Sequence, residues 1–158
     1  MKTLIVFYSL DGNTKLISDE IARETGADIL ELKPKKDISN KNFMKYIWGG
    51  RQVVMKEKPE LYPFDKNPLD YDVIFIGTPV WAFNFVPAFR TFFENVKLSG
   101  KKIAIFCCHE GGKGKTLENM KEELNGNEII GENDFEKVLK GNKEECLKKA
   151  IFWAKSLV

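Results

Sequence analysis

The sequence predicts an α/β protein in which helices cover both faces of a parallel sheet. Short runs of apolar residues alternate along the whole chain with segments whose apolar residues recur at helical spacing. The runs at residues 73–76 and 103–106 lack polar alternation, which is typical of parallel strands buried on both faces. The chain has 158 residues, the length of one domain, so we expect residues 1–158 to fold as a single unit.

The first two strands are expected near the start of the chain. Residues 4–8 form a continuous apolar run that is too short for a helix. Asp11-Gly12-Asn13 then breaks the run, and apolar residues at helical spacing follow until Gly26 ends a predicted helix. Residues 29–32 give a weaker second strand, which Pro34 closes.

The middle of the chain supplies the third and fourth strands and a helix between them. The strands are the runs at 73–76 and 103–106. Pro87 suits the first turn of a helix, and the residues after it place one apolar face on that helix: Phe89, Phe92, Phe93 and Val96.

Two further helices and a poor fifth strand are expected in the last third. Thr116 could cap a helix that ends near Gly126, and residues 129–130 make a short apolar run. Asn142 and Glu145 have the spacing of a capping pair. The helix after them carries a continuous apolar stripe: Leu147, Ala150, Ile151, Ala154 and Leu157.

Residues 33–70 are the irregular part of the sequence. Phe43, Tyr46 and Ile47 have helical spacing, but Gly49-Gly50 should kink or divide any helix there. The charges of this stretch lean basic, which fits a solvated helix face better than a docking surface for an acidic partner.

Composition and charge exclude several functional classes. Apolar residues make up 43% and charged residues 30% of the chain, the balance of a soluble globular protein. The net charge of +2 leaves no concentrated basic face, so nucleic acid is not expected as a partner. No apolar run approaches the roughly 18 residues of a membrane span, and the start does not resemble a signal peptide. Three cysteines without metal-ligand spacing indicate a reducing, cytoplasmic location rather than a disulfide scaffold.

Three loops leave the carboxyl ends of the first, third and fourth strands, where parallel sheets bind their ligands. The first loop, residues 9–14, combines Ser9, Asn13 and Thr14 with Gly12 and the start of a helix. Short polar side chains and free N–H groups in this order favour an anion such as a phosphate. The alternative is a polar turn with a helix cap.

The second loop, residues 78–84, places Trp81 and Phe83 between a strand and a helix. Exposed rings are costly there unless they cover something, so the loop favours a flat aromatic ligand stacked by Trp81. The alternative is that both rings cap the end of the hydrophobic core, and for Phe83 alone this interpretation is favoured.

The third loop, residues 107–115, is rich in glycine. Gly114-Lys115-Thr116 imitates the end of a phosphate-binding P-loop, but the first glycine of that motif would fall on His109. The dinucleotide motif G-x-G-x-x-G fails as well, so both matches are treated as chance. The glycines instead let the backbone approach a flat ligand.

No catalytic group is indicated by these loops. His109 is the only histidine, which excludes a histidine-based metal site, and no nucleophile elbow supports a catalytic triad. Cys107 and Cys108 should point to opposite faces of the sheet as inert thiols.

Taken together, the segments 8–14, 77–82 and 111–114 resemble the three FMN-binding loops of the flavodoxin family, in order and over essentially the whole chain. The resemblance implies a five-stranded sheet in the order 2-1-3-4-5 and FMN as the cofactor. In the first loop it implies that the phosphate is held by Ser9, Leu10, Asp11, Gly12, Asn13 and Thr14. In the second it implies that the isoalloxazine ring is lined by Thr78, Pro79, Val80, Trp81, Ala82 and Asn84, with Trp81 stacked on it. In the third it implies that the pyrimidine side of the ring meets His109, Glu110, Gly111, Gly112 and Gly114.

The chain departs from the family pattern at three points. Asp11 stands where the commoner loop has a threonine, and this puts a carboxylate beside the phosphate. Residues 79–84 contain no glycine for the peptide flip of many flavodoxins, which Asn84 could partly replace. The net charge of +2 contrasts with the strongly acidic character of flavodoxin carriers.

The resemblance implies an electron-transfer protein that shuttles electrons between redox partners, a reductase and an acceptor. The fixed phosphate and the low-dielectric site should make the reduced, negatively charged flavin harder to form. The alternative is an FMN-dependent NAD(P)H:quinone-type oxidoreductase of the same fold. Two further alternatives are a P-loop-like nucleotide binder and a module of this fold that has lost its cofactor and binds protein only.

Overall fold

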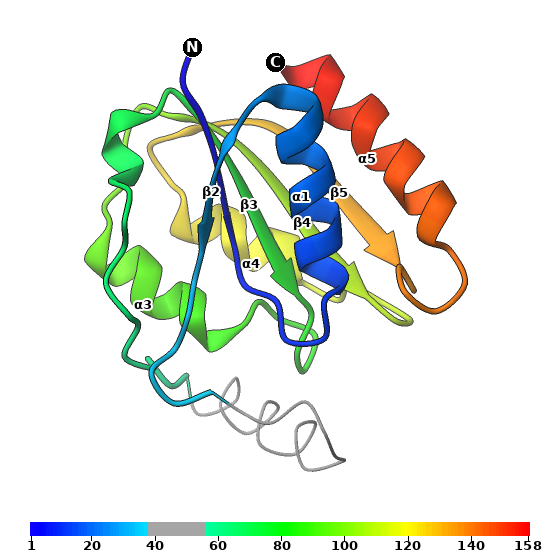
Figure 1. Ribbon diagram of the computed structural model, residues 1–158. Helices are drawn as coiled ribbons and strands as arrows, with labels where there is room; N and C mark the ends of the chain where they lie inside the picture. The colour runs from blue at the N-terminus through cyan, green and yellow to red at the C-terminus, as the bar shows by residue number, and fades with distance from the viewer. Residues whose placement is uncertain (38–55) are drawn as a thin grey trace.

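The computed structural model describes residues 1–37 and 56–158 (Figure 1). In this part of the chain the strands form one parallel sheet in the order β2-β1-β3-β4-β5, which confirms the fold class and the strand order. The strands are β1 (Thr3–Phe7), β2 (Asp28–Glu31), β3 (Val73–Pro79), β4 (Lys102–His109) and β5 (Glu128–Glu136).

Helices cover both faces of this sheet, as the buried strands predict. They are α1 (Asn13–Thr25), α3 (Pro87–Asn95), α4 (Thr116–Glu123) and α5 (Lys143–Leu157), with a 3₁₀ turn η1 (Pro68–Asp70) before β3. Figure 1 shows α1 and α5 on one face of the sheet and α3 and α4 on the other.

Each face has its own hydrophobic core, because successive strand residues point to opposite sides. Leu4 and Val6 of β1 join the core beneath α3 and α4, whereas Ile5 and Phe7 join the core beneath α1 and α5. All four are completely buried, which explains why the strand reads as a continuous apolar run. Cys107 and Cys108 divide between the two cores in the same way, as predicted.

The fifth strand is much longer than the sequence predicts. β5 covers nine residues, Glu128–Glu136, and follows β4 with a register shift beside Ile103. The strand lies at the edge of the sheet and is mostly half-buried or exposed, so polar residues are tolerated along it. Hydrogen bonding to β4, rather than side-chain pattern, sets its length.

The helix ends agree only partly with the expected capping residues. Gly26 ends α1 in the left-handed conformation with φ 70°, and its N–H donates to the Ala22 carbonyl, as predicted. Helix α5 begins after Asn142, but the capping pair with Glu145 is wrong: the Asn142 amide donates instead to the Glu136 carbonyl. Thr116 is the first residue of α4 rather than its cap.

The two described segments that flank residues 38–55 pair with each other. Lys35 N–H donates to the Glu60 carbonyl and Tyr62 N–H to the Lys33 carbonyl, both at 2.8 Å. The predicted helix with Phe43, Tyr46 and Ile47, and its kink at Gly49-Gly50, lie outside the described residues. None of the helices described here is long and apolar enough to cross a membrane.

Candidate functional site

The three polar loops meet at the carboxyl edge of the sheet. Because β1, β3 and β4 are neighbours and run parallel, the segments that follow Phe7, Pro79 and His109 leave the sheet side by side (Figure 1). The strand order reverses between β1 and β3, and sheets of this kind bind ligands at that position.

The first loop turns sharply into α1. Gly12 precedes the helix with φ 95°, a left-handed conformation that favours glycine, and its N–H donates to Ser9 Oγ at 3.2 Å. The first intrahelical bond runs from Leu16 N–H to the Gly12 carbonyl. The amides of the first turn therefore have no carbonyl partner within the helix, and no acidic residue lies in that turn.

Thr14 carries a buried hydroxyl in this first turn. The residue is 1% exposed, and its Oγ1 has no hydrogen-bond partner in the described part of the chain. A buried polar atom without a partner costs about 1–3 kcal/mol. A phosphate bound at this helix N-terminus would supply the missing hydrogen-bond partner.

Asn13 connects the first loop to a segment that sequence reasoning missed, the loop between β5 and α5. Its Oδ1 accepts the Leu139 N–H at 3.0 Å. A Cβ added at Gly12 would lie 3.5 Å from Leu139 Cδ1. The two residues of the hydrogen bond are 126 positions apart, and no local pattern indicates the contact.

The second loop closes in a tight turn at residues 81–84. Trp81 and Asn84 exchange two backbone hydrogen bonds of 3.0 Å, and the residues between them, Ala82 and Phe83, have φ values of 48° and 60°. Positive φ at both central positions is normally met by glycine or asparagine, so this turn holds backbone strain beside the candidate site.

Phe83 does not cap the core, so that part of the prediction is wrong. Its side chain is 72% exposed, because the turn carries it outward at the tip. Its backbone instead lies against the third loop: a Cβ added at Gly114 would lie 2.6 Å from Phe83 Cβ. Glycine at position 114 is therefore what lets the second and third loops touch.

Thr78 and Trp81 are held by contacts within the protein. The Thr78 hydroxyl is fully buried, donates to the Pro79 carbonyl at 2.7 Å and accepts the Val86 N–H at 3.2 Å. The half-buried Trp81 ring packs edge-on against Tyr8, with 5.4 Å between ring centroids and an interplanar angle of 88°. The two hydrogen bonds of its hydroxyl hold the fully buried Thr78 in place inside the protein, and no part of the residue is open to solvent.

The Tyr8 hydroxyl lies beside Asp37, another contact that sequence reasoning missed. It donates to both carboxylate oxygens of Asp37, at 2.7 and 2.9 Å. Burial, followed by the hydrogen bond to Asp37, raises the pKa of Tyr8 well above its usual value. The phenol therefore stays protonated. Its hydrogen bonds to Asp37 fix the Tyr8 ring, against which the Trp81 ring packs.

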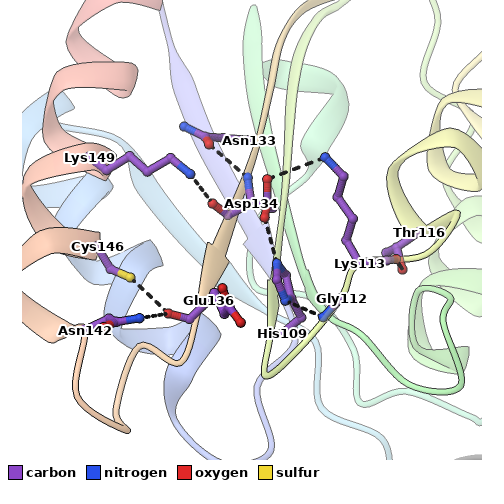
Figure 2. Close-up of polar contacts among 10 residues, drawn as sticks. All are labelled: His109, Gly112, Lys113, Thr116, Asn133, Asp134, Glu136, Asn142, Cys146 and Lys149. Atoms are coloured by element: carbon purple, nitrogen blue, oxygen red, sulfur yellow. Dashed lines mark hydrogen bonds and ion pairs between the residues drawn. The ribbon is translucent and has the colours of Figure 1, made fainter.

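The third loop begins at His109, which is 8% exposed in its side chain. His109 Nε2 lies 2.7 Å from Asp134 Oδ2, and the Gly112 N–H donates to Nδ1 at 2.9 Å (Figure 2). Glu110 pairs with Lys140 of the β5–α5 loop at 2.8 Å. Residues 111–115 are exposed, so the glycine-rich turn presents its backbone to solvent at the edge of the site.

The P-loop-like segment Gly114-Lys115-Thr116 does not form a phosphate-binding loop. The Thr116 hydroxyl, which a P-loop would offer to a magnesium ion, donates to the Lys113 carbonyl at 2.6 Å and is buried.

Burial raises the pKa of Cys107 to about 12 and also raises that of Cys108, as inert thiols require. The described residues include no group of three or more histidine, cysteine, aspartate or glutamate side chains that could hold a metal ion.

The fold and the loop cluster define a doubly wound α/β protein with its ligand edge at the carboxyl ends of β1, β3 and β4. The chain belongs to the flavodoxin family, whose sequence pattern, described as Flavodoxin, matches residues 2–151.

Solved structures share the fold at low sequence identity. The flavoprotein of Lactobacillus acidophilus in complex with FMN is 24% identical, with a TM-score of 0.72 over 87% of this chain and 95% of that one. A Bacteroides uniformis protein is 20% identical, with a TM-score of 0.80 over 98% and 97% of the two chains. Oxidised flavodoxin 1 of Bacillus cereus is 20% identical, with a TM-score of 0.60 over 99% and 97%. No curated protein sequence matches the chain.

Proposed function

We propose that this chain binds FMN at the carboxyl edge of its sheet and carries electrons between redox partner proteins. Membership of the flavodoxin family supports the class of protein, and a similar fold in complex with FMN is known from the Lactobacillus acidophilus flavoprotein. The flavin ring supplies the electron-transfer chemistry when it is bound. The chain binds, orients and shields it.

The observation that carries the proposal is the buried Thr14 hydroxyl. Its Oγ1 lacks a partner among the described residues, and it lies in a helix turn with free amides and no carboxylate. A phosphate would accept from this hydroxyl, from the amides of the turn and from the Asn13 NH₂ group. Asp11 is exposed at the same loop, so its charge is screened by water rather than buried against the phosphate.

The second and third loops would hold the ring. Trp81 is half-buried and packs against Tyr8, and its indole would stack on the ring. The backbone from Pro79 to Asn84 and the turn around Gly112 would meet the polar edges of the ring. The exposed Phe83 lies at the tip of the same turn, where a partner protein could approach.

A flavin titration tests this function. Purified apoprotein mixed with FMN should quench flavin fluorescence and shift the visible flavin spectrum with one-to-one stoichiometry. A protein that FMN cannot reconstitute, by either measure, would contradict the proposal.

Anaerobic mixing with NADPH distinguishes an electron carrier from an NAD(P)H-dependent oxidoreductase. We expect the visible absorbance of the FMN complex to persist with NADPH alone and to bleach only when a flavodoxin reductase is added. Rapid bleaching by NADPH alone would identify an NAD(P)H-dependent oxidoreductase instead.

A pair of substitutions tests the stacking role of Trp81. Trp81→Ala should weaken FMN and riboflavin by the same factor and restore flavin fluorescence, whereas Trp81→Phe, which keeps a flat ring, should retain most of the quenching. Quenching that survives in Trp81→Ala would show that the indole does not stack on the ring.

A further inference from the structure

His109 lies between a carboxylate on the neighbouring strand and the turn that it precedes. Its Nε2 faces Asp134 Oδ2 at 2.7 Å, and its Nδ1 accepts the Gly112 N–H at 2.9 Å (Figure 2). The imidazole is the only one in the sequence. Its side chain is 8% exposed, whereas Gly112 is exposed to solvent.

The two contacts fix the protonation pattern of the ring. Gly112 N–H is a donor, so Nδ1 must be unprotonated to accept it, and the single ring proton lies on Nε2, facing Asp134. A second proton, on Nδ1, would set two donors face to face at 2.9 Å. A protonated His109 therefore cannot keep its contact with Gly112.

The two partners of the ring use different nitrogens. Asp134 accepts the proton on Nε2, whereas the Gly112 amide needs the lone pair of Nδ1. Burial alone would raise the pKa of Asp134, but the hydrogen bond to His109 and the ammonium groups of Lys113 and Lys149 hold it below its usual value. Other charged residues of the described chain lie close by: Glu136 is the β5 partner of His109, Lys137 N–H donates to the His109 carbonyl, and Lys140 pairs with Glu110.

The tip of the turn, Gly111 and Gly112, has room to move once the Gly112 contact is lost, while Glu110 stays paired with Lys140 and Gly114 stays packed against Phe83. A Cβ added at Gly111 or Gly112 would meet nothing within 4 Å. The remaining tether from the turn to Asp134 is Lys113, whose Nζ lies 3.5 Å from Oδ1 and whose side chain is 47% exposed. An exposed ion pair of this kind contributes little.

We propose that His109, oriented by Asp134, is a positioning residue that holds the tip of the 110–114 turn through Gly112, and that protonation of His109 releases this tip. The proposed function sets this turn at the edge of the flavin ring, and on that basis release of the turn lowers flavin affinity at acid pH. The pair thus makes the third loop sensitive to pH.

Nuclear magnetic resonance of the apoprotein tests the release without any flavin. We expect the ¹⁵N shifts of the imidazole to report the Nε2–H form at high pH, and the Gly112 amide to titrate with the same midpoint as the ring. Asp134→Asn should move both midpoints together to lower pH, and Asp134→Glu should move them back toward the wild type. Glu132→Gln, which removes a charge two residues away on the same strand, should move neither.

The outcomes that overturn the release are equally specific. A ring protonated on Nδ1 at high pH, or a Gly112 amide that does not follow the imidazole, contradicts the positioning role. In His109→Gln the titration of the Gly112 amide should disappear. A titration that persists in this variant would assign the release to another group.

Riboflavin tests the link to the cofactor, because it lacks the phosphate, which titrates near pH 6 on its own. Wild-type affinity for riboflavin should fall several-fold as pH drops through the His109 midpoint, and the affinity of His109→Gln should not change across it. Equal wild-type affinities on both sides would overturn the link. If neither FMN nor riboflavin binds at any pH, the proposed function is wrong, and the resonance titration still decides whether His109 holds the turn.

Discussion

Thr14 is the residue on which the proposed phosphate site depends most. Its hydroxyl is buried beneath the turn that opens α1 and has no partner among the described residues. Proteins rarely keep such a group unless function requires it, because an apolar side chain of the same shape would be more stable. Under the proposed function, the unpaired hydroxyl lowers the stability of the apoprotein and strengthens its binding of FMN.

Thr14→Val should separate these two effects. We expect the apoprotein to gain about 1 kcal/mol of unfolding free energy, since valine has the same shape and no unsatisfied hydroxyl. FMN should bind about 1–3 kcal/mol more weakly, while riboflavin affinity stays the same. Denaturant unfolding and flavin titration measure the two quantities.

Thr25→Val is the matched control on the same helix. The Thr25 hydroxyl donates to the Ile21 carbonyl at 2.7 Å, so its loss should lower stability and leave both flavin affinities unchanged. Equal losses of FMN and riboflavin in Thr14→Val would contradict the phosphate assignment.

Gly77 is a residue at which packing permits no side chain. It lies within β3, and an added Cβ would lie 2.2 Å from the Phe106 ring. Gly77→Ala should therefore lower the unfolding free energy by about 1–3 kcal/mol, because the ring must leave its rotamer or the strands must separate. Gly111→Ala, with nothing within 4 Å of its Cβ, should change stability by less than about 0.5 kcal/mol. Denaturant unfolding of both variants gives the comparison.

At the scale of elements, the turn at residues 81–84 is the strained part of the site. Ala82 and Phe83 both adopt left-handed conformations that cost a non-glycine residue about 1–2 kcal/mol. The strain is held by two hydrogen bonds between Trp81 and Asn84 and by the Asn84 side chain, which accepts from Asn119 of α4 at 3.0 Å. The turn thus fixes the position of Trp81.

Ala82→Gly should relieve part of this strain. The gain expected in unfolding free energy is about 0.5–1 kcal/mol, because glycine adopts positive φ without a steric cost but loses more entropy on folding. Ala22→Gly in α1 should have the opposite sign and destabilise by a similar amount. A loss of stability in Ala82→Gly would show that the turn is not strained at this position.

At the scale of the whole molecule, buried thiols make stability depend on alkaline pH. Burial raises the pKa of Cys107 from 9.0 to about 12 and also raises that of Cys108. Between those values the unfolded chain loses thiol protons that the folded chain keeps, so deprotonation favours unfolding. The stability these thiols contribute is complete below about pH 9 and is lost as pH rises toward 12.

The double variant Cys107→Ala/Cys108→Ala should flatten that decline. Each thiol contributes a slope of up to about 1.4 kcal/mol per pH unit, so the difference between wild type and variant should shrink steadily above about pH 9. Urea unfolding at pH 7 and at several alkaline pH values measures it. A constant difference at all pH values would show that the thiols ionise equally in both states.

Sequence patterns predicted the central elements because burial on both faces leaves a strong local signal. β1, β3 and β4 read as continuous apolar runs, and α1 ends at Gly26 as expected. For β5 the sequence predicts only residues 129–130, because an edge strand needs no continuous apolar pattern. The capping pair of Asn142 failed because the Glu136 carbonyl competes for its side chain.

The sequence by itself determined the fold class, the strand order through its family resemblance, and the three loops that gather at one edge of the sheet. Only the tertiary structure decided what holds those loops: Asn13 on Leu139, Tyr8 on Asp37, and His109 between Asp134 and Gly112. The physical reason is the separation along the sequence of the residues that interact. Strands and helices follow from the period of neighbouring residues, whereas a hydrogen bond between distant side chains depends on where the sheet places their strands, and no local pattern encodes that distance.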